Sequence, residues 1–151
     1  MPVALALHAL SATIWVGGMF FAYMALRPVA AQLLEPPLRL ALWSRTFAQF
    51  FPWVWAAVAL LPATGYWMIL GPFGGFAATP MYVHVMQVIG IAMILIFLHV
   101  YFAPYRRLRR LVDIADYPAA AKQLAQIRRL IAINLALGLV TVVVAVTGRY
   151  L

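Results

Sequence analysis

The sequence contains no cysteine and very little charge, and each absence excludes a class of protein. Without cysteine, disulfide bonds, zinc–thiolate sites, iron–sulfur clusters and covalently attached c-type haem are excluded. Charged residues make up 9% of the chain and hydrophobic residues 67%, whereas soluble domains are about 25% charged and about 45–50% apolar. A globule of 151 residues cannot bury so much apolar surface. The chain is therefore predicted to form one domain, residues 1–151, embedded in lipid.

Four apolar stretches are long enough to cross a bilayer, which takes about 20 residues. None contains Asp, Glu, Lys or Arg, and their continuous apolar character favours helices. The expected fold is an all-α integral membrane four-helix bundle with up-down-up-down topology. Short interfacial or cytoplasmic helices are expected between spans 1 and 2 and between spans 3 and 4. The predicted spans are residues 3–26, 50–70, 82–103 and 130–147.

Acidic residues are also scarce, with three against eleven basic ones. Ten of the eleven lie in the connections between spans 1 and 2 and between spans 3 and 4, and only Arg149 follows span 4. The positive-inside rule places those connections in the cytoplasm of a plasma membrane or bacterial inner membrane, with both termini periplasmic or extracellular. This topology and anionic lipid account for the net charge of +8, so no nucleic-acid binding is expected.

Three histidines lie inside the predicted spans, where ionisable residues are functional candidates by default. His8 and His84 are expected near the outer ends of spans 1 and 3, which are diagonal neighbours in such a bundle. Two imidazoles facing each other across that diagonal suit the axial ligation of a haem iron. His99 is expected near the cytoplasmic end, either as the ligand of a second haem or as a hydrogen-bond partner of Asn134.

The face that continues from His8 along span 1 carries residues that leave room for a flat cofactor. Ser11, Trp15 and Gly18 follow at three- and four-residue spacing, and Asn134 begins a similar stripe in span 4. Ser11 or a backbone carbonyl is expected to orient the ring of His8. The candidate cofactor-binding residues are His8, His84, His99, Ser11, Trp15, Gly18 and Asn134.

Copper is the alternative to haem at the same end of the bundle. Met81 and Met86 flank His84, and Met68 ends span 2 on the same side. Imidazole and thioether groups are suitable ligands of Cu(I), so the alternative site consists of His8, His84, Met81 and Met86. Methionine is also an ordinary filler of apolar helices, and the residues leave both metals open.

Two segments resemble the CopD-like family of membrane proteins. The opening LHALSATIWVGGMFFAYMALRP (residues 7–28) is similar to that family's first helix, in which a leucine–histidine pair precedes a W-x-G-G turn. IRRLIAINLALGLVTVVVAVTGR (residues 127–149) is similar to its last helix. The family carries a copper-resistance name, and its wider relatives include the HemJ-type protoporphyrinogen oxidases, four-helix proteins that bind haem b. In that branch the resemblance implies that His8 is the haem ligand.

The HemJ-type proteins also have a lysine near the start of the third helix, where this chain has His84-Val85-Met86-Gln87. The main hypothesis is therefore a b-type membrane cytochrome that holds haem b between His8 and His84 and transfers single electrons near the outer face. The alternatives are a copper-binding or copper-transport protein and, third, protoporphyrinogen oxidation, so that any enzyme activity would be that of an oxidoreductase. Expected partners are the lipid bilayer, haem, a quinone or separate redox protein, and a second copy of the chain packed through Gly17, Gly18 and Gly138.

Overall fold

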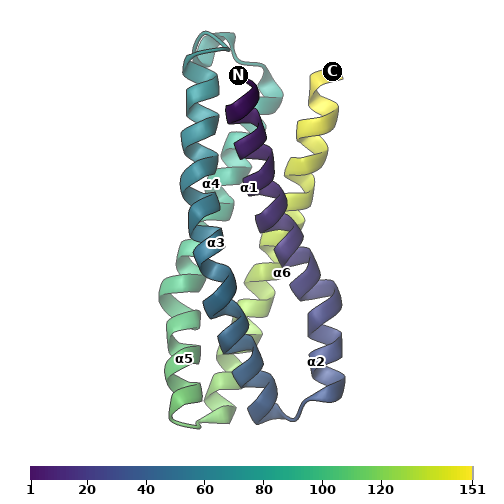
Figure 1. The fold of residues 1–151 in the computed structure, drawn as a ribbon, viewed down its shortest axis with the longest axis vertical. Helices are drawn as coiled ribbons and strands as arrows, with labels where there is room; N and C mark the ends of the chain where they lie inside the picture. The colour runs from purple at the N-terminus through teal and green to yellow at the C-terminus, as the bar shows by residue number, and fades with distance from the viewer. Residues whose placement is uncertain (151) are drawn as a thin grey trace.

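The computed structural model describes residues 1–150, and within them the secondary structure is entirely helical (Figure 1). Four helical segments are long and apolar enough to cross a membrane. This confirms the predicted all-α membrane fold with four spans. The segments are Pro2–Leu33, Pro36–Leu70, Met81–Asp113 and Tyr117–Tyr150.

Two of the four segments contain a π-helical turn. The first consists of α1 (Pro2–Phe21), the π-helix η1 (Ala22–Leu26) and α2 (Arg27–Leu33). The third consists of α4 (Met81–Val100), the π-helix η3 (Tyr101–Tyr105) and α5 (Arg106–Asp113). Such wide turns are rare and occur mostly inside longer α-helices, as here.

The other two segments are nearly uninterrupted. The second segment is the single helix α3 (Pro36–Leu70), and the fourth is α6 (Tyr117–Thr147) followed by the 3₁₀ turn η4 (Gly148–Tyr150). A further 3₁₀ turn, η2 (Phe76–Ala78), lies in the connection between α3 and α4.

The helix ends follow local sequence signals. Pro36 and Pro37 occupy the first turn of α3, where the N–H group that proline lacks has no helical partner. At the start of α6, a carboxylate oxygen of Asp116 accepts a hydrogen bond from the Ala119 N–H at 3.2 Å, as expected of an N-cap residue.

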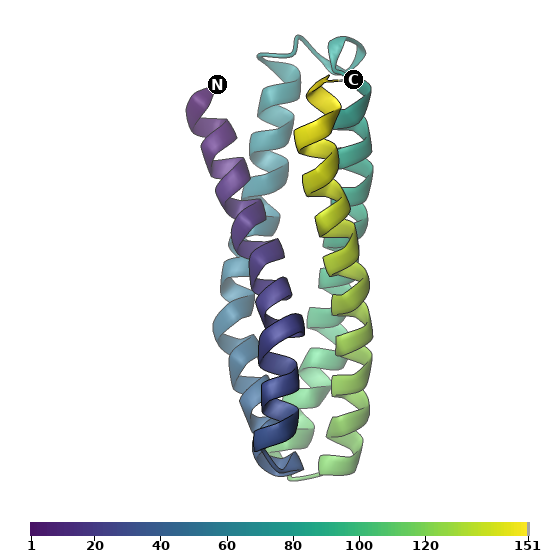
Figure 2. The same cartoon turned by 90° about the vertical axis from the view of Figure 1, so that its right-hand side faces the viewer.

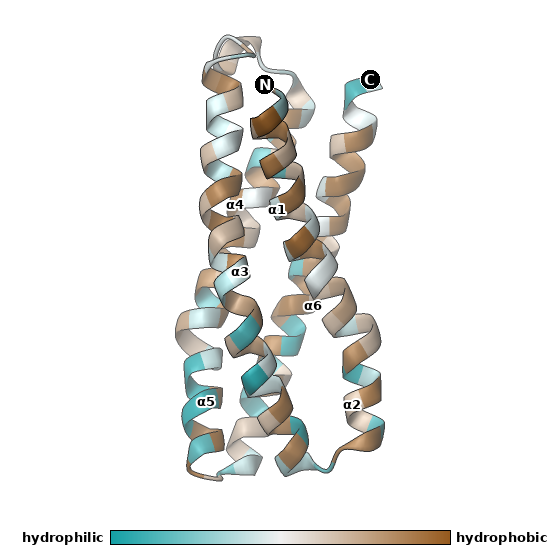
Figure 3. Cartoon of the chain, viewed as in Figure 1, coloured by the Kyte–Doolittle hydropathy of each residue, from teal (hydrophilic) through white to brown (hydrophobic). Residues whose placement is uncertain are grey.

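Both termini and the connection 71–80 lie at one end of the bundle, here called the terminal end (Figures 1 and 2). The connections between α2 and α3 and between α5 and α6 lie at the opposite end, here called the basic end. Figure 3 shows hydrophilic residues gathered on α5 and the neighbouring helices there, which is where the sequence concentrates its arginines. The side of the membrane that each end faces remains the prediction of the positive-inside rule.

Short helices do lie between the predicted spans: α2 follows span 1 and α5 follows span 3, and each is joined to the preceding helix by a π-helical turn. Residues 36–49, by contrast, are the first part of α3 and continue directly into span 2. Continuing a helix keeps the backbone N–H and C=O groups paired, whereas a break near the bilayer would leave several of them without partners. The long helices therefore project beyond the apolar stretches that predicted them.

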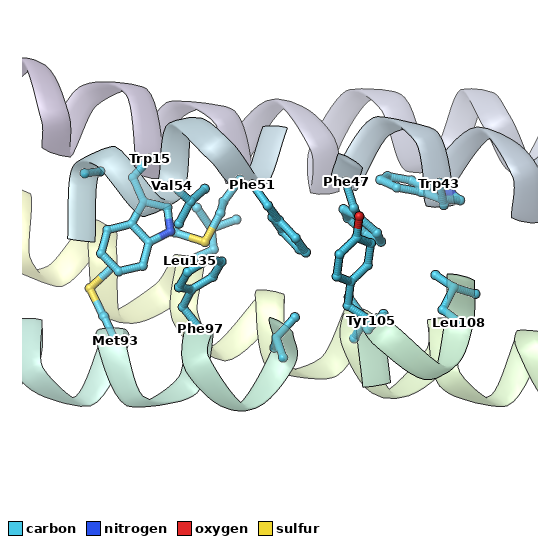
Figure 4. Close-up of a cluster of buried hydrophobic side chains, with 14 of the residues drawn as sticks. Trp15, Trp43, Phe47, Phe51, Val54, Met93, Phe97, Tyr105, Leu108 and Leu135 are labelled. Atoms are coloured by element: carbon cyan, nitrogen blue, oxygen red, sulfur yellow. The ribbon is translucent and has the colours of Figure 1, made fainter. Parts of the chain in front are cut away.

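The core of the basic half is a ladder of aromatic rings. Trp43, Phe47 and Phe51 recur at four-residue spacing on α3, and the ring centroids of Phe47 and Phe51 are 5.1 Å apart in a stacked arrangement. Tyr105 meets Phe51 edge to face at 4.7 Å, and Phe97 meets it at 5.5 Å. Figure 4 shows these side chains pointing toward one another between the helices. Such pairs add about 0.5–1.5 kcal/mol each beyond the area that they bury.

Candidate functional site

His8 is held against α3 in the terminal half of the bundle. Its Nδ1 atom lies 2.8 Å from the hydroxyl oxygen of Thr64. The Thr64 hydroxyl donates its one proton to the carbonyl of Leu60 at 2.6 Å. We therefore assign the Nδ1–H of His8 as the donor to Thr64, which leaves Nε2 unprotonated with its lone pair available. This is the tautomer that a metal ligand binding through Nε2 requires.

The backbone of α3 also shapes this position. A Cβ atom added to Gly65 would lie 3.4 Å from Cε1 of His8, so the imidazole lies directly over a residue without a side chain. Thr64 fills the orienting role that the sequence analysis gave to Ser11, which is itself buried on α1. Thr64 was missed as a partner because it is 56 positions from His8 in the sequence. The available signal was that a threonine is one of the few polar residues of span 2.

His84 faces the connection 71–80. Its Nε2 atom lies 3.2 Å from the carbonyl oxygen of Phe76 and, since a carbonyl only accepts, donates its proton there. The imidazole ring of His84 and the phenyl ring of Phe76 stack with their centroids 6.5 Å apart. His84 precedes the buried Met93 by nine residues, which is two and a half turns, and therefore lies on the opposite face of α4.

The arrangement gives no support to a haem bridging His8 and His84. The first histidine is bonded to α3 and the second to the connection 71–80. Trp15, Gly18 and Asn134 do come together around a cavity in the bundle core, but its volume is about 160 Å³ and neither histidine lines it. Pockets that enclose drug-sized ligands measure roughly 300–1,000 Å³, so a porphyrin does not fit there without rearrangement.

The expected pair of His99 and Asn134 is not formed. His99 is exposed on the outer surface of α4. Asn134 is only 4% exposed, and the oxygen of its side chain has no hydrogen-bond partner among the described residues. His99 directly precedes the buried Val100, and one residue rotates a helical side chain by about 100°, which turns the imidazole away from the core.

Two methionines lie on the interior-facing sides of α3 and α4 in the terminal half. Met68 is one turn beyond Thr64 on the same face of α3 and is 8% exposed. Met86 is half-buried and precedes the buried Met93 by seven residues, so it lies on the core-facing side of α4. Met81, by contrast, is 75% exposed at the first position of α4.

A hydrogen bond between α4 and α3 shows that these two methionines lie at similar heights along the bundle axis. The side-chain amide of Gln87 donates to the hydroxyl of Tyr66 at 2.9 Å. Met86 adjoins Gln87, and Met68 follows Tyr66 by two residues, so the two methionines lie within about one turn of each other in height. His8, opposite Thr64, lies about one turn from Met68.

Within residues 1–150 no group of three or more His, Cys, Asp and Glu side chains comes together. The side chains of His8, Met68 and Met86 carry imidazole and thioether groups, which are suitable ligands of Cu(I).

Two of the three glycines expected to contact a second copy of the chain pack inside the bundle instead. Gly138 is covered within the chain by Val16 and Met93, and Gly18 is covered by the ring of Phe50. These two glycines therefore serve packing inside the bundle. Gly17 has no neighbouring atom within 4 Å of the position of an added Cβ.

The four apolar helical segments and the polar groups between them define a polytopic α-helical membrane protein. Residues 44–147 match the CopD family, described as copper resistance protein D, and because the match covers more than half of the sequence, the chain belongs to this family. The resemblance drawn from the sequence is thereby confirmed, although the opening segment with His8 lies outside the matched residues. No curated protein and no solved structure matches the chain.

Proposed function

We propose that this protein binds copper, as the ion that it handles, at the terminal end of the bundle. Nε2 of His8 and the sulfur atoms of Met68 and Met86 are the ligands. The observation that carries the proposal is the contact of Nδ1 of His8 with the hydroxyl of Thr64, at the height of two interior-facing methionines, from which we infer that Nε2 is the nitrogen left to bind a metal. The copper-resistance description of the family supports the same metal.

The surroundings favour Cu(I) over Cu(II). All three ligands are neutral, and the nearby residues of α1 and α3 are apolar, so the charge of the ion is not neutralised by the protein. Burying an uncompensated charge is costly, and the cost rises with the charge of the ion. The soft thioether ligands favour the monovalent ion as well. His84 and Met81, which the sequence analysis included in the copper set, are not part of the proposed site.

The site is close to one membrane surface. His8 lies six residues after Pro2, the first residue of α1, which is about 9 Å along the helix axis. Under the positive-inside rule the terminal end faces the periplasm or the exterior, so copper would enter from that side. The aromatic ladder fills the core of the basic half, which favours binding or hand-over at the terminal end over conduction through one subunit.

The experiment is an anaerobic Cu(I) titration of the purified protein in nanodiscs against a chromophoric chelator. We expect one copper per chain and at least a tenfold weaker affinity in His8→Ala and Met68→Leu, because each loses one of three ligands. Met81→Leu is the matched control and should bind like the wild type, since this methionine is exposed.

Two outcomes would overturn the proposal. One is an unchanged copper affinity in His8→Ala. The other is a b-type α-band in the reduced protein, at one haem per chain, that disappears in both His8→Ala and His84→Ala, because this result would establish the haem site that the sequence analysis favoured.

A further inference from the structure

A groove of about 710 Å³ runs along one face of α3, from the basic end toward the middle of the bundle. The residues that line it between Leu38 and Trp53 recur every three or four positions, so they share one face of the helix. One of them, Phe50, also covers Gly18 of α1. Trp53, at the inner end, is 60% exposed, and the groove is therefore open to the surrounding lipid.

The polar residues of the groove lie at heights that match the layers of a bilayer. The apolar stretch of α3 begins at residue 50, and Arg45 lies five residues before it, about 7–8 Å along the helix axis. Each headgroup layer is about 5–8 Å thick, so the backbone of Arg45 is level with the lipid phosphates. Gln49 lies at the edge of the hydrocarbon core, at the height of the lipid ester groups, and Trp53 lies inside the core.

The groove carries positive charge without an acidic partner. Arg45 is exposed, and none of the three acidic residues of the chain lines the groove. The side chains of a helix lean toward its N-terminus, which for α3 is the basic end, so the guanidinium group of Arg45 extends toward the headgroups. A guanidinium group forms paired hydrogen bonds with phosphate oxygens. Charge and depth therefore both favour an anionic phosphate group as the occupant.

A second copy of the chain is a poorer occupant. In a twofold dimer whose axis is normal to the membrane, α3 would pack against the same helix of the other copy, and Arg45 would face Arg45. Two like charges held face to face oppose association. An anionic lipid meets the same surface without this repulsion.

We propose that the inner part of the groove, from Arg45 to Trp53, binds one anionic phospholipid of the leaflet at the basic end. Arg45 binds the phosphate group, Thr46 and Gln49 donate hydrogen bonds to the ester oxygens, and one acyl chain lies along Phe50 and Trp53. In a zwitterionic lipid the ammonium group competes with Arg45 for the phosphate, so the anionic lipid binds more tightly. The site contains none of the proposed copper ligands, and the proposal does not rest on copper binding.

The experiment measures which lipid lies in the groove. Because the chain has no cysteine, Trp53→Cys introduces a unique position for a bimane fluorophore. The labelled full chain is placed in phosphatidylcholine vesicles at about 0.5 M KCl, which screens charges that are not in contact. Phosphatidylglycerol or phosphatidylcholine with a nitroxide on the acyl chain is then added as the quencher. We expect half-maximal quenching at an about fivefold lower mole fraction of the phosphatidylglycerol.

Two matched controls separate this site from general attraction to the basic end. Arg45→Gln in the Trp53→Cys background should abolish the preference, whereas Arg129→Gln should leave it unchanged, because Arg129 is exposed at the same end but lies outside the groove. Bimane at Ile133→Cys on α6 should be quenched alike by the two lipids. Ile133, like Trp53, lies three residues inside its apolar stretch and is exposed, but it does not line the groove.

The proposal fails if the two lipids quench the Trp53→Cys label alike, or if Arg45→Gln retains the full preference. It also fails if Arg129→Gln abolishes the preference as completely as Arg45→Gln does. Absence of quenching by either lipid would overturn it as well, because this result would show that protein, such as a second copy of the chain, covers the groove. Circular dichroism establishes that each variant is folded before it is labelled.

Discussion

In the basic half of the bundle, rings from α3, α4 and η3 fill the space between the helices, whereas in the terminal half hydrogen bonds between side chains join the helices. The ladder of Phe47, Phe51 and Tyr105 belongs to the first region. The bonds from His8 to Thr64 and from Gln87 to Tyr66 belong to the second. Inside a membrane, an interhelical hydrogen bond contributes only about 0.6 kcal/mol on average.

We therefore expect the basic half to contribute most of the stability and the terminal half to contain the metal-binding side chains. The core of the basic half consists of aromatic and aliphatic side chains, whereas the terminal half contains the histidine, threonine and methionines of the proposed copper site. Functional sites are commonly drawn from the less stable parts of a structure. The predictions that follow change the basic half, the boundary between the halves and the terminal half in turn.

The largest loss of stability is expected from Phe51→Ala. Phe51 is 4% exposed and contacts four other aromatic rings. Its truncation should lower the free energy of unfolding by about 3–5 kcal/mol. Reversible unfolding in mixed detergent micelles measures this, with the lipid-facing Phe20→Ala as the control, expected within about 0.5 kcal/mol of wild type. Equal effects of the two variants would show that the aromatic ladder does not stabilise the bundle.

An intermediate effect is expected where the two halves meet. An added Cβ at Gly138 would lie 2.8 Å from a methyl of Val16 and 3.2 Å from the terminal methyl of Met93. Gly138→Ala should therefore destabilise the bundle by about 1–3 kcal/mol through overpacking. Gly17→Ala is the control, because the space around Gly17 is open, and it should be neutral or stabilise by about 0.5–1 kcal/mol. The same unfolding assay would refute this account if Gly138→Ala were the milder change.

The smallest change in stability is expected from Thr64→Val, which removes the hydroxyl group and keeps the shape. Loss of one interhelical hydrogen bond should cost about 0.6 kcal/mol. The copper affinity should nevertheless fall about tenfold, since the orientation and tautomer of His8 are no longer fixed. The Cu(I) titration tests this, with Thr141→Val on α6 as a control, because that hydroxyl bonds only within its own helix. An unchanged affinity would show that Thr64 does not position His8.

The fold was largely predictable because span length and charge distribution are properties of the sequence itself. The four spans and the cap at Asp116 follow from local signals. The π-turns and the continuation of α3 through residues 38–49 could not be predicted, because they depend on how neighbouring helices pair the backbone.

The site was predictable only in part. His8 was identified because an ionisable residue in a membrane span is conspicuous, but its partner Thr64 comes from another helix, and no local pattern links the two. The orientation of His84 was available from the sequence, since nine residues separate it from Met93 in a helix of 3.6 residues per turn. Depth alone was used to pair it with His8, and depth does not specify which face of a helix a residue occupies.

The central claim is that His8 and two methionines bind copper at the terminal end. X-ray absorption at the copper edge of the Cu(I)-loaded protein in nanodiscs tests it most directly. The account predicts one nitrogen and two sulfur scatterers around the metal, with the nitrogen lost in His8→Ala and one sulfur lost in Met68→Leu. A first shell without sulfur, or one identical in the wild type and His8→Ala, would contradict it.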